Sequence, residues 1–106
     1  MPHDRKESSV VSTLAGHPTL GSLVRAFVDR LPSRREAIEE AFRDGDLERL
    51  QVLAHGLRGS GGTYGFEPLS RAAEELEESL RAGAGRDEVA AAVARLADLC
   101  RRAVVS

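Results

Sequence analysis

The residues best suited to chemistry lie together in the stretch AHGLRGSGG, residues 54–62, which contains one histidine and four glycines. A solvated imidazole is mostly neutral at pH 7, so a ring nitrogen of His55 can act as a nucleophile and accept a phosphoryl group. Arg58, three residues later, can pair with the negative charge that this group brings. The phosphorus–nitrogen bond is labile, because protonated imidazole leaves easily. The residues therefore predict reversible phosphoryl transfer.

Such transfer requires His55 to project from a rigid element, and the spacing of nearby apolar residues predicts a helix. An apolar stripe with alternating steps of three and four runs through Leu47, Leu50, Ala54, Leu57, Gly61 and Tyr64. On that helix His55 falls on the outer face, with Gln51 beside it. Four glycines at about 1 kcal/mol each are costly relative to alanine. We interpret Gly61 as allowing a neighbouring helix to approach, and Gly59 and Gly62 as clearing space around the imidazole for an incoming carboxylate.

The preceding chain predicts two further helices and a short one. Residues 20–31 carry an apolar stripe that Pro32 is expected to end, and Ser33 is expected to cap a second helix. Gly45 then ends that helix and Asp46 caps the helix of His55. The stretch VVSTLAGHP predicts one short helical turn before this series.

Two more amphipathic stripes follow the glycine-rich segment, the second with Asp87 as its expected cap. They comprise Leu69, Ala72, Ala73, Leu76 and Leu80, and then Val89, Val93, Leu96, Cys100 and Ala103. Strand and hairpin signals are absent from the sequence. Short connections favour antiparallel neighbours, so the predicted fold is an all-α, up-down antiparallel four-helix bundle with a short extra N-terminal helix. We expect residues 1–8 to be a frayed, disordered N-terminus and residues 9–106 to form the bundle domain.

Composition narrows the class of protein. A chain of 106 residues suits one domain, and only 4% aromatic residues favour packed helices over a sandwich or barrel. The net charge of −2 argues against nucleic acid as a partner. No apolar run reaches the roughly 20 residues of a membrane span, and no secretory signal is apparent. The single cysteine, Cys100, allows no internal disulfide, which fits the cytoplasm, and its place in the last apolar stripe indicates a small core residue.

Other candidate residues have simpler interpretations. His3 and His17 are expected to be inert, and no metal site is predicted because no ligand spacing is present. The acidic stretch EELEES, residues 74–79, is most simply a solvated helix face. Glu48 and Glu67 are candidates for orienting the imidazole, although nothing local distinguishes them from ordinary surface charge. Tyr64 and Phe66 are expected to belong to the core.

The stretch AHGLRGSGGTYGFEPLSRAAEELE resembles the signature of the histidine-containing phosphotransfer (HPt) domains of bacterial multistep phosphorelays. The family typically shows His-x-Leu-Lys-Gly-Ser, which aligns here with His55, Leu57, Arg58, Gly59 and Ser60. The resemblance covers about residues 20–80. Arg58 stands where the family usually has lysine. The positive charge is kept, and Lys6 is the only lysine in the whole chain. The planar guanidinium of arginine is expected to bind a phosphoryl group more tightly than lysine does. Gly61 is a smaller departure, since the family often has serine or alanine there.

The resemblance implies roles for these residues. His55 is the phosphoacceptor, Arg58 pairs with the phosphate, and Gln51 supports the phosphoryl oxygens. Gly59 lets a partner dock. The implied partners are response-regulator receiver domains and a hybrid sensor kinase, with no cofactor on this chain and any Mg²⁺ on the receiver. The chain itself lacks a nucleotide-binding motif, so we expect a carrier and no kinase. We also expect it to be cytoplasmic and monomeric.

Two other functions stay open at this stage. The first is a non-phosphorylated helical adaptor that binds a receiver or kinase domain through the same face. The second is an enzyme with His55 as general base, although no second catalytic group in a cleft is evident. The initial methionine and short polar lead favour a stand-alone protein over a domain of a larger kinase.

Overall fold

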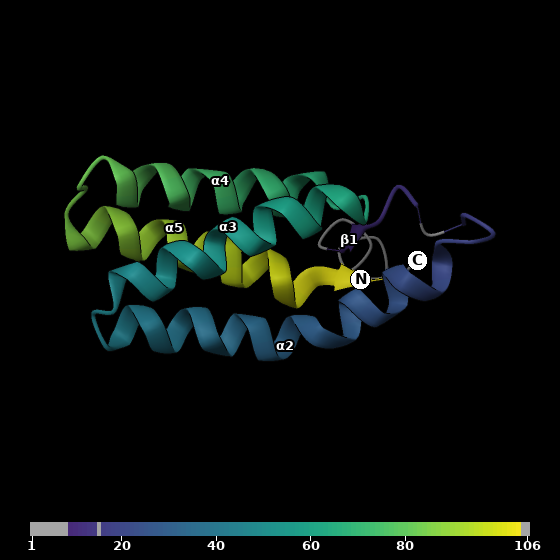
Figure 1. The fold of residues 1–106 in the computed structure, drawn as a ribbon, viewed down its shortest axis with the longest axis horizontal. Helices are drawn as coiled ribbons and strands as arrows, with labels where there is room; N and C mark the ends of the chain where they lie inside the picture. Colours follow the sequence, from purple (N-terminus) through teal and green to yellow (C-terminus); the bar gives the residue numbers. More distant parts are fainter. Residues whose placement is uncertain (1–8, 15, 105–106) are drawn as a thin grey trace, which may run out of the picture.

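In the computed structural model, which describes residues 9–14 and 16–104, the chain forms a bundle of four long helices. These are α2 (Gly21–Arg43), α3 (Leu47–Thr63), α4 (Glu67–Arg81) and α5 (Arg86–Arg102). Helix α3 packs against α4, α4 against α5, α5 against α2, and α2 against α3 (Figure 1). The predicted all-α bundle is confirmed.

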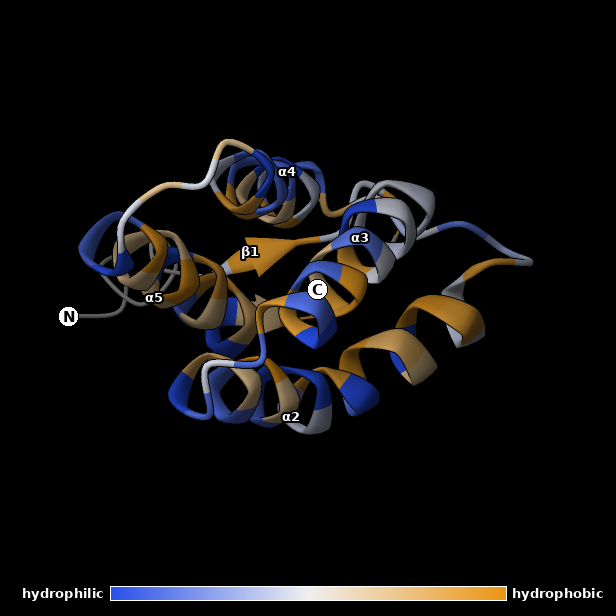
Figure 2. Ribbon diagram, turned by 60° about the vertical axis from the view of Figure 1, so that its left-hand side comes forward, coloured by the Kyte–Doolittle hydropathy of each residue, from blue (hydrophilic) through white to orange (hydrophobic). Residues whose placement is uncertain are grey.

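Each helix contributes one apolar face to a shared core. The hydrophobic sides of α2 and α4 face the space between the helices in Figure 2. The largest fully buried aliphatic side chains are Leu31 and Ile38 from α2, Leu50 and Leu57 from α3, Leu69 and Leu76 from α4, and Leu96 from α5. Phe66 is also fully buried, while Tyr64 packs at the edge of the core. Its ring stacks on Phe27 at a centroid distance of 5.1 Å, which closes the end of α3.

The prediction that Pro32 separates two helices was wrong, because α2 runs through it as one helix. Leu31 and Ile38 lie seven residues apart and are both buried, so a single apolar stripe continues past the proline. Pro32 itself is exposed, so its ring displaces no core side chain, although it removes one backbone hydrogen bond from the helix. The helix changes direction along its length in Figure 1, as expected for an internal proline.

The expected short N-terminal helix is not found among described residues 9–14 and 16–20. Val10–Val11 instead form strand β1, which pairs in parallel with strand β2 (Ala103–Val104) directly after α5. Leu14 accepts a backbone hydrogen bond from His17, which makes a turn and not a continuing helix. Two-residue strands are too short to show the alternation by which a strand is predicted. The expected frayed segment, residues 1–8, lies outside the described residues.

Helix α3 forms as predicted, across all four glycines. Its first turn is capped by the Asp46 side chain, which accepts a hydrogen bond from the Arg49 backbone N–H at 3.1 Å. Gly45 precedes this cap with φ +71°, a conformation that suits glycine. Helix α5 differs slightly from expectation: Gly85 is its N-cap, and Asp87 lies within its first turn.

Gly61 explains how α3 and α4 come so close together. A Cβ atom on Gly61 would lie 3.1 Å from the backbone nitrogen of Ser70, which is tighter than ordinary contact. The Ser70 hydroxyl also donates a hydrogen bond to the carbonyl of Arg58. The predicted packing role of Gly61 is confirmed.

No helix within the described part of the chain is long and apolar enough to cross a membrane.

Candidate functional site

His55 projects from the middle of α3 into solvent. Its side chain is 70% exposed, while Ala54 and Leu57 beside it are buried in the core. The exposed position expected for the imidazole is therefore found, on a regular stretch of helix.

The imidazole is bonded to a buried carboxylate on α4. His55 Nδ1 lies 2.9 Å from Glu77 Oε2, and the Glu77 side chain is only 4% exposed. Two arginines donate to the same carboxylate: Arg58 to Oε1 at 3.2 Å and Arg81 to Oε2 at 3.3 Å. Glu77 therefore links the two helices and joins His55 to both cations.

The charge on Glu77 determines which ring nitrogen of His55 is free. Burial raises the pKa of Glu77, but hydrogen bonds and positive charge from His55 and Arg58 outweigh it and leave the pKa below its usual 4.5. An ionised carboxylate can only accept hydrogen bonds, so Nδ1 of the ring must donate its hydrogen. In the neutral ring the lone pair is then on Nε2. Nε2 is therefore the ring nitrogen with an available lone pair.

Glu77 was not predicted as a site residue, and the interpretation of residues 74–79 as a solvated face was wrong at this residue. A signal was present: Glu77 stands four residues after Ala73 and one after Leu76, on the edge of the apolar stripe of α4. A charged residue in such a position needs a partner, because burying an unpaired charge is costly. Of the two acids considered, Glu67 pairs with Arg71 instead.

Gln51 lies beside the imidazole as expected. It lines an open depression in the surface together with Glu48, Val52, His55 and Glu77. Glu48 therefore faces the same space as the ring, although Glu77 is the acid bonded to it. The structure thus brings together His55, Arg58 and Gln51, and adds Glu77 and Arg81.

The glycines around the imidazole differ in what surrounds them. A Cβ atom on Gly59 would meet no described atom within 4 Å, so this position is open to solvent. A Cβ on Gly62 would lie 3.6 Å from the Ser70 hydroxyl, an ordinary contact with α4. Gly62 is exposed, but α4 extends beside it, so the space there is less open than at Gly59.

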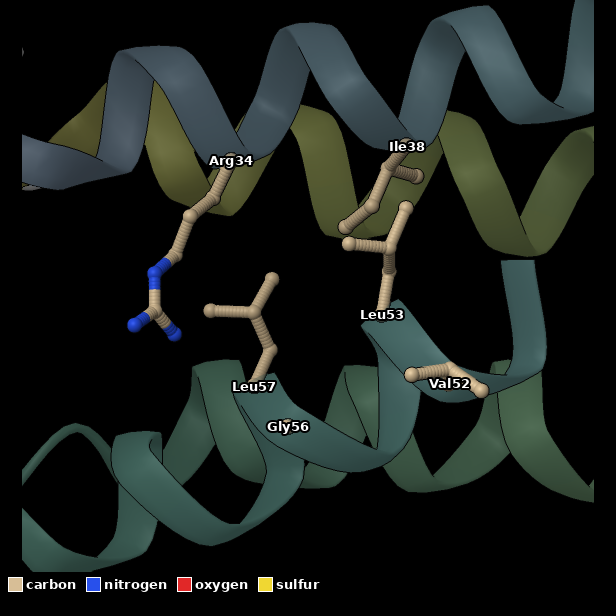
Figure 3. A pocket seen from close by; sticks show the side chains of 6 residues that line it. All are labelled: Arg34, Ile38, Val52, Leu53, Gly56 and Leu57. Atoms are coloured by element: carbon tan, nitrogen blue, oxygen red, sulfur yellow. The ribbon is translucent and has the colours of Figure 1, made fainter. Parts of the chain in front are cut away.

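A second hollow lies on the other side of α3, between α3 and α2. Figure 3 shows Arg34 and Ile38 of α2 opposite Leu53 and Leu57 of α3, with Gly56 and Val52 completing the lining. Val52 is 68% exposed and lines both this groove and the depression around His55. The two hollows therefore meet across an apolar side chain on α3.

The other candidate residues are not part of this site. The Nδ1 atom of His17 accepts hydrogen bonds from the backbone N–H groups of Thr19 and Leu20. Cys100 is buried in the core, and burial raises the pKa of its thiol to about 11. Among the described residues, no group of three or more His, Cys, Asp or Glu side chains is arranged to hold a metal ion. His3 lies outside the described residues.

A family model described as Hpt domain matches residues 22–104. This range includes the four helices except the first residue of α2, the site around His55 and the buried Glu77 on α4. No curated protein and no solved structure gives a significant match.

Proposed function

Because the chain belongs to the Hpt domain family, whose members are phosphotransfer modules of phosphorelays, we propose that His55 carries the phosphoryl group. The chain accepts this group from the aspartate of one receiver domain and passes it to the aspartate of another. The observation that supports this most directly is the exposed imidazole whose Nδ1 is bonded to an ionised, buried Glu77.

In the accepting step, the Nε2 lone pair of His55 attacks the phosphorus of the receiver's aspartyl phosphate. A phosphorus–nitrogen bond forms while the phosphorus–oxygen bond breaks, and the electron pair leaves with the aspartate carboxylate. The ring keeps its Nδ1 hydrogen and becomes positively charged, and Glu77 stabilises that charge as an acid does behind a catalytic histidine. Donation to the second receiver is the reverse, with the charged imidazole as leaving group.

Two neighbours are suited to the phosphoryl oxygens. Arg58 is 43% exposed and lies one turn along α3 from His55, so its guanidinium can move from Glu77 to the new negative charge. Gln51, four residues before His55, lines the same depression and can donate a hydrogen bond from its side-chain amide. Arginine instead of the usual lysine offers two parallel donors to a phosphoryl group, which favours retention.

The surface of α3 next to His55 suits a docking receiver. Gly59 and Gly56 present no side chain to an approaching partner, and Val52 offers exposed apolar area beside the imidazole. We assign the contact surface to this side of α3, with the groove toward Arg34 at its edge. Gly62 leaves less open space for a partner than Gly59 does, because a Cβ atom there would contact the Ser70 hydroxyl.

We further propose that this exchange occurs in a bacterial cytoplasm with the chain as a monomer. A hybrid sensor kinase supplies the phosphoryl group through its receiver, and this chain acts as the carrier and not as a kinase. Any Mg²⁺ that the reaction needs is held by the receiver domain.

The test is transfer of labelled phosphate from a panel of receiver domains phosphorylated on aspartate. We expect label on this chain that is stable in base and labile in acid, that is lost in His55→Gln and that is retained in His17→Gln. Circular dichroism should show the same helix content in all three proteins.

Label that persists in His55→Gln would exclude His55 as the acceptor. Binding of a receiver at the α3 surface without any label would instead favour the non-phosphorylated adaptor.

A further inference from the structure

Glu77 has two cationic partners with different positions. Arg58 comes from α3 and bonds Oε1, while Arg81 comes from the next turn of α4 and bonds Oε2, the same oxygen that accepts from His55. An exposed ion pair four residues apart on a helix usually stabilises a protein very little. Arg81 is unusual because the acid it bonds is 4% exposed and also holds the imidazole.

Phosphorylation of His55 would place a third anion beside Arg58. Arg58 already lies 4.0 Å from Glu74 through its Nε atom and 3.2 Å from Glu77 through Nη1. A phosphoryl group adds about 1.5 to 2 negative charges at pH 7. Suppose that the Arg58 guanidinium turned to the phosphoryl group and no other cation took its place at Glu77. Glu77 would then stay buried but lose a counter-ion just as negative charge increased nearby.

We propose that Arg81 is a positioning residue for phosphoryl transfer: it keeps Glu77 neutralised and bonded to Nδ1 while the phosphoryl group on His55 draws Arg58 away. This rests on the proposed function of His55. Arg81 thereby favours the phosphorylated state without touching the phosphoryl group. The charged groups that face Glu77 are His55 and Arg58 from α3 and Arg81 from α4, and Glu48 lines the same depression.

The chain provides a matched control on the same helix. Arg71 bonds Glu67 with the same four-residue spacing and the same 3.3 Å distance, and both partners of that pair are exposed. Arg71→Gln therefore removes an equivalent ion pair of α4 away from the imidazole. Arg81→Gln removes the charge at the site, and Arg81→Lys retains it.

The experiment uses N-phosphoimidazole as the donor, so that no receiver domain is needed. The phosphorus–nitrogen bond of the donor breaks, imidazole leaves, and the same kind of bond forms on His55. The equilibrium constant of this exchange is measured by ³¹P NMR, with His55→Gln as the background for other histidines. We expect Arg81→Gln to lower the constant about threefold to tenfold, whereas Arg81→Lys and Arg71→Gln change it by less than about twofold.

A second measurement follows the ¹³C signal of the Glu77 carboxyl with pH, before and after phosphorylation. We expect the pKa of Glu77 to rise on phosphorylation in Arg81→Gln, because both arginines have then left the carboxylate while the phosphoryl group adds negative charge nearby, but not in Arg71→Gln. A merely structural ion pair would leave this signal equally unaffected in the two variants.

Equal equilibrium constants for Arg81→Gln and Arg71→Gln would overturn the proposal, as would a loss that Arg81→Lys does not restore. Failure of the wild-type His55 to accept any phosphoryl group would overturn it together with the proposed function. Phosphorylation by N-phosphoimidazole without transfer to any receiver would contradict only the proposed function.

Discussion

At the scale of single residues, His55 is controlled by a carboxylate 22 positions away in the chain. In the proposed transfer the exposed ring supplies the reactive atom, while the bonded Glu77 determines which nitrogen holds the hydrogen and stabilises the charge that develops. Arg58, which the sequence indicates as a phosphate partner, is bonded to Glu77 before any phosphate is present. The site is therefore a charge network, and its members cannot be assigned roles one at a time.

Glu77 should make stability depend on pH in a defined window. Its pKa is lowered in the folded protein, so its ionised form stabilises the fold above its ordinary pKa of 4.5, and this contribution is lost as the pH falls below that value. We expect Glu77→Gln to lower the free energy of unfolding by about 1–2 kcal/mol at pH 7, and by less at pH 3–4. Urea unfolding at each pH measures both differences.

The control for this variant is Glu74→Gln, which changes the half-exposed acid beside the same arginine. We expect only a small, nearly pH-independent effect there. A pH-independent loss in Glu77→Gln as well would contradict the assigned charge.

The exposed position of His55 could be predicted from the sequence and its buried partner could not. His55 and Arg58 are neighbours in the chain, so their residue types and spacing carry the information. Glu77 meets them only when α4 packs on α3, and its acidic neighbours, which are not fully buried, hide it within a charged stretch. Its place on the apolar stripe was the single local sign.

At the scale of elements, α3 shows that glycine serves different ends at different faces of one helix. Gly61 permits the close approach of α4, whereas Gly56 and Gly59 are open to solvent. The backbone of this helix is therefore specified by contacts with α4 more than by its own propensity.

Alanine at two of these positions should have opposite effects. In Gly61→Ala the new Cβ would lie 3.1 Å from the Ser70 backbone nitrogen, which forces α4 to shift. We expect a loss of about 1–3 kcal/mol in the free energy of unfolding. Gly56→Ala meets open space and should gain about 0.5–1 kcal/mol from helix propensity. Denaturant unfolding measures both, and stabilisation of both variants would contradict the close packing.

The sequence predicted α3 better than α2. Asp46 and the apolar spacing defined the start and the buried face of α3 despite its glycines. Pro32 predicted a break in α2, because proline has no backbone N–H to donate and its ring clashes with the preceding turn of a helix. Burial of Leu31 and Ile38 on one face, which depends on α5 and α3, outweighs that cost.

At the scale of the whole molecule, the N-terminal segment ties the two ends of the described chain to the end of α3. Strand β1 pairs with β2 after α5, and Thr13 donates a backbone hydrogen bond to Gly65 at 2.9 Å. The buried Ser12 hydroxyl also bonds the Tyr64 carbonyl. Two-residue strands and one turn carry no recognisable pattern, so this arrangement could not be predicted from sequence.

Gly65 should be the most sensitive point of this arrangement. It has φ +81°, and a Cβ there would lie 2.7 Å from the side-chain oxygens of Ser12 and Thr13. We expect Gly65→Ala to destabilise the fold by about 2–4 kcal/mol, from backbone strain and from overpacking. Gly45→Ala has similar strain in open space, and should cost about 1–2 kcal/mol.

Thermal unfolding compares the two glycine variants, and hydrogen exchange at the Thr13 amide reports the N-terminal segment directly. Equal losses in both variants, with Thr13 still protected, would contradict the tight contact at Gly65.

The pairing of Val10 with Ala103 makes the described chain almost a closed loop. A circular permutant is therefore compatible with the bundle: a short flexible linker would join residues 9 and 104, and new ends would be opened in the turn at Gly83, where a Cβ atom would meet no described atom within 4 Å. Such a rearrangement leaves α3, α4 and their shared charge network intact while it reverses the order in which α5 and α2 are synthesised.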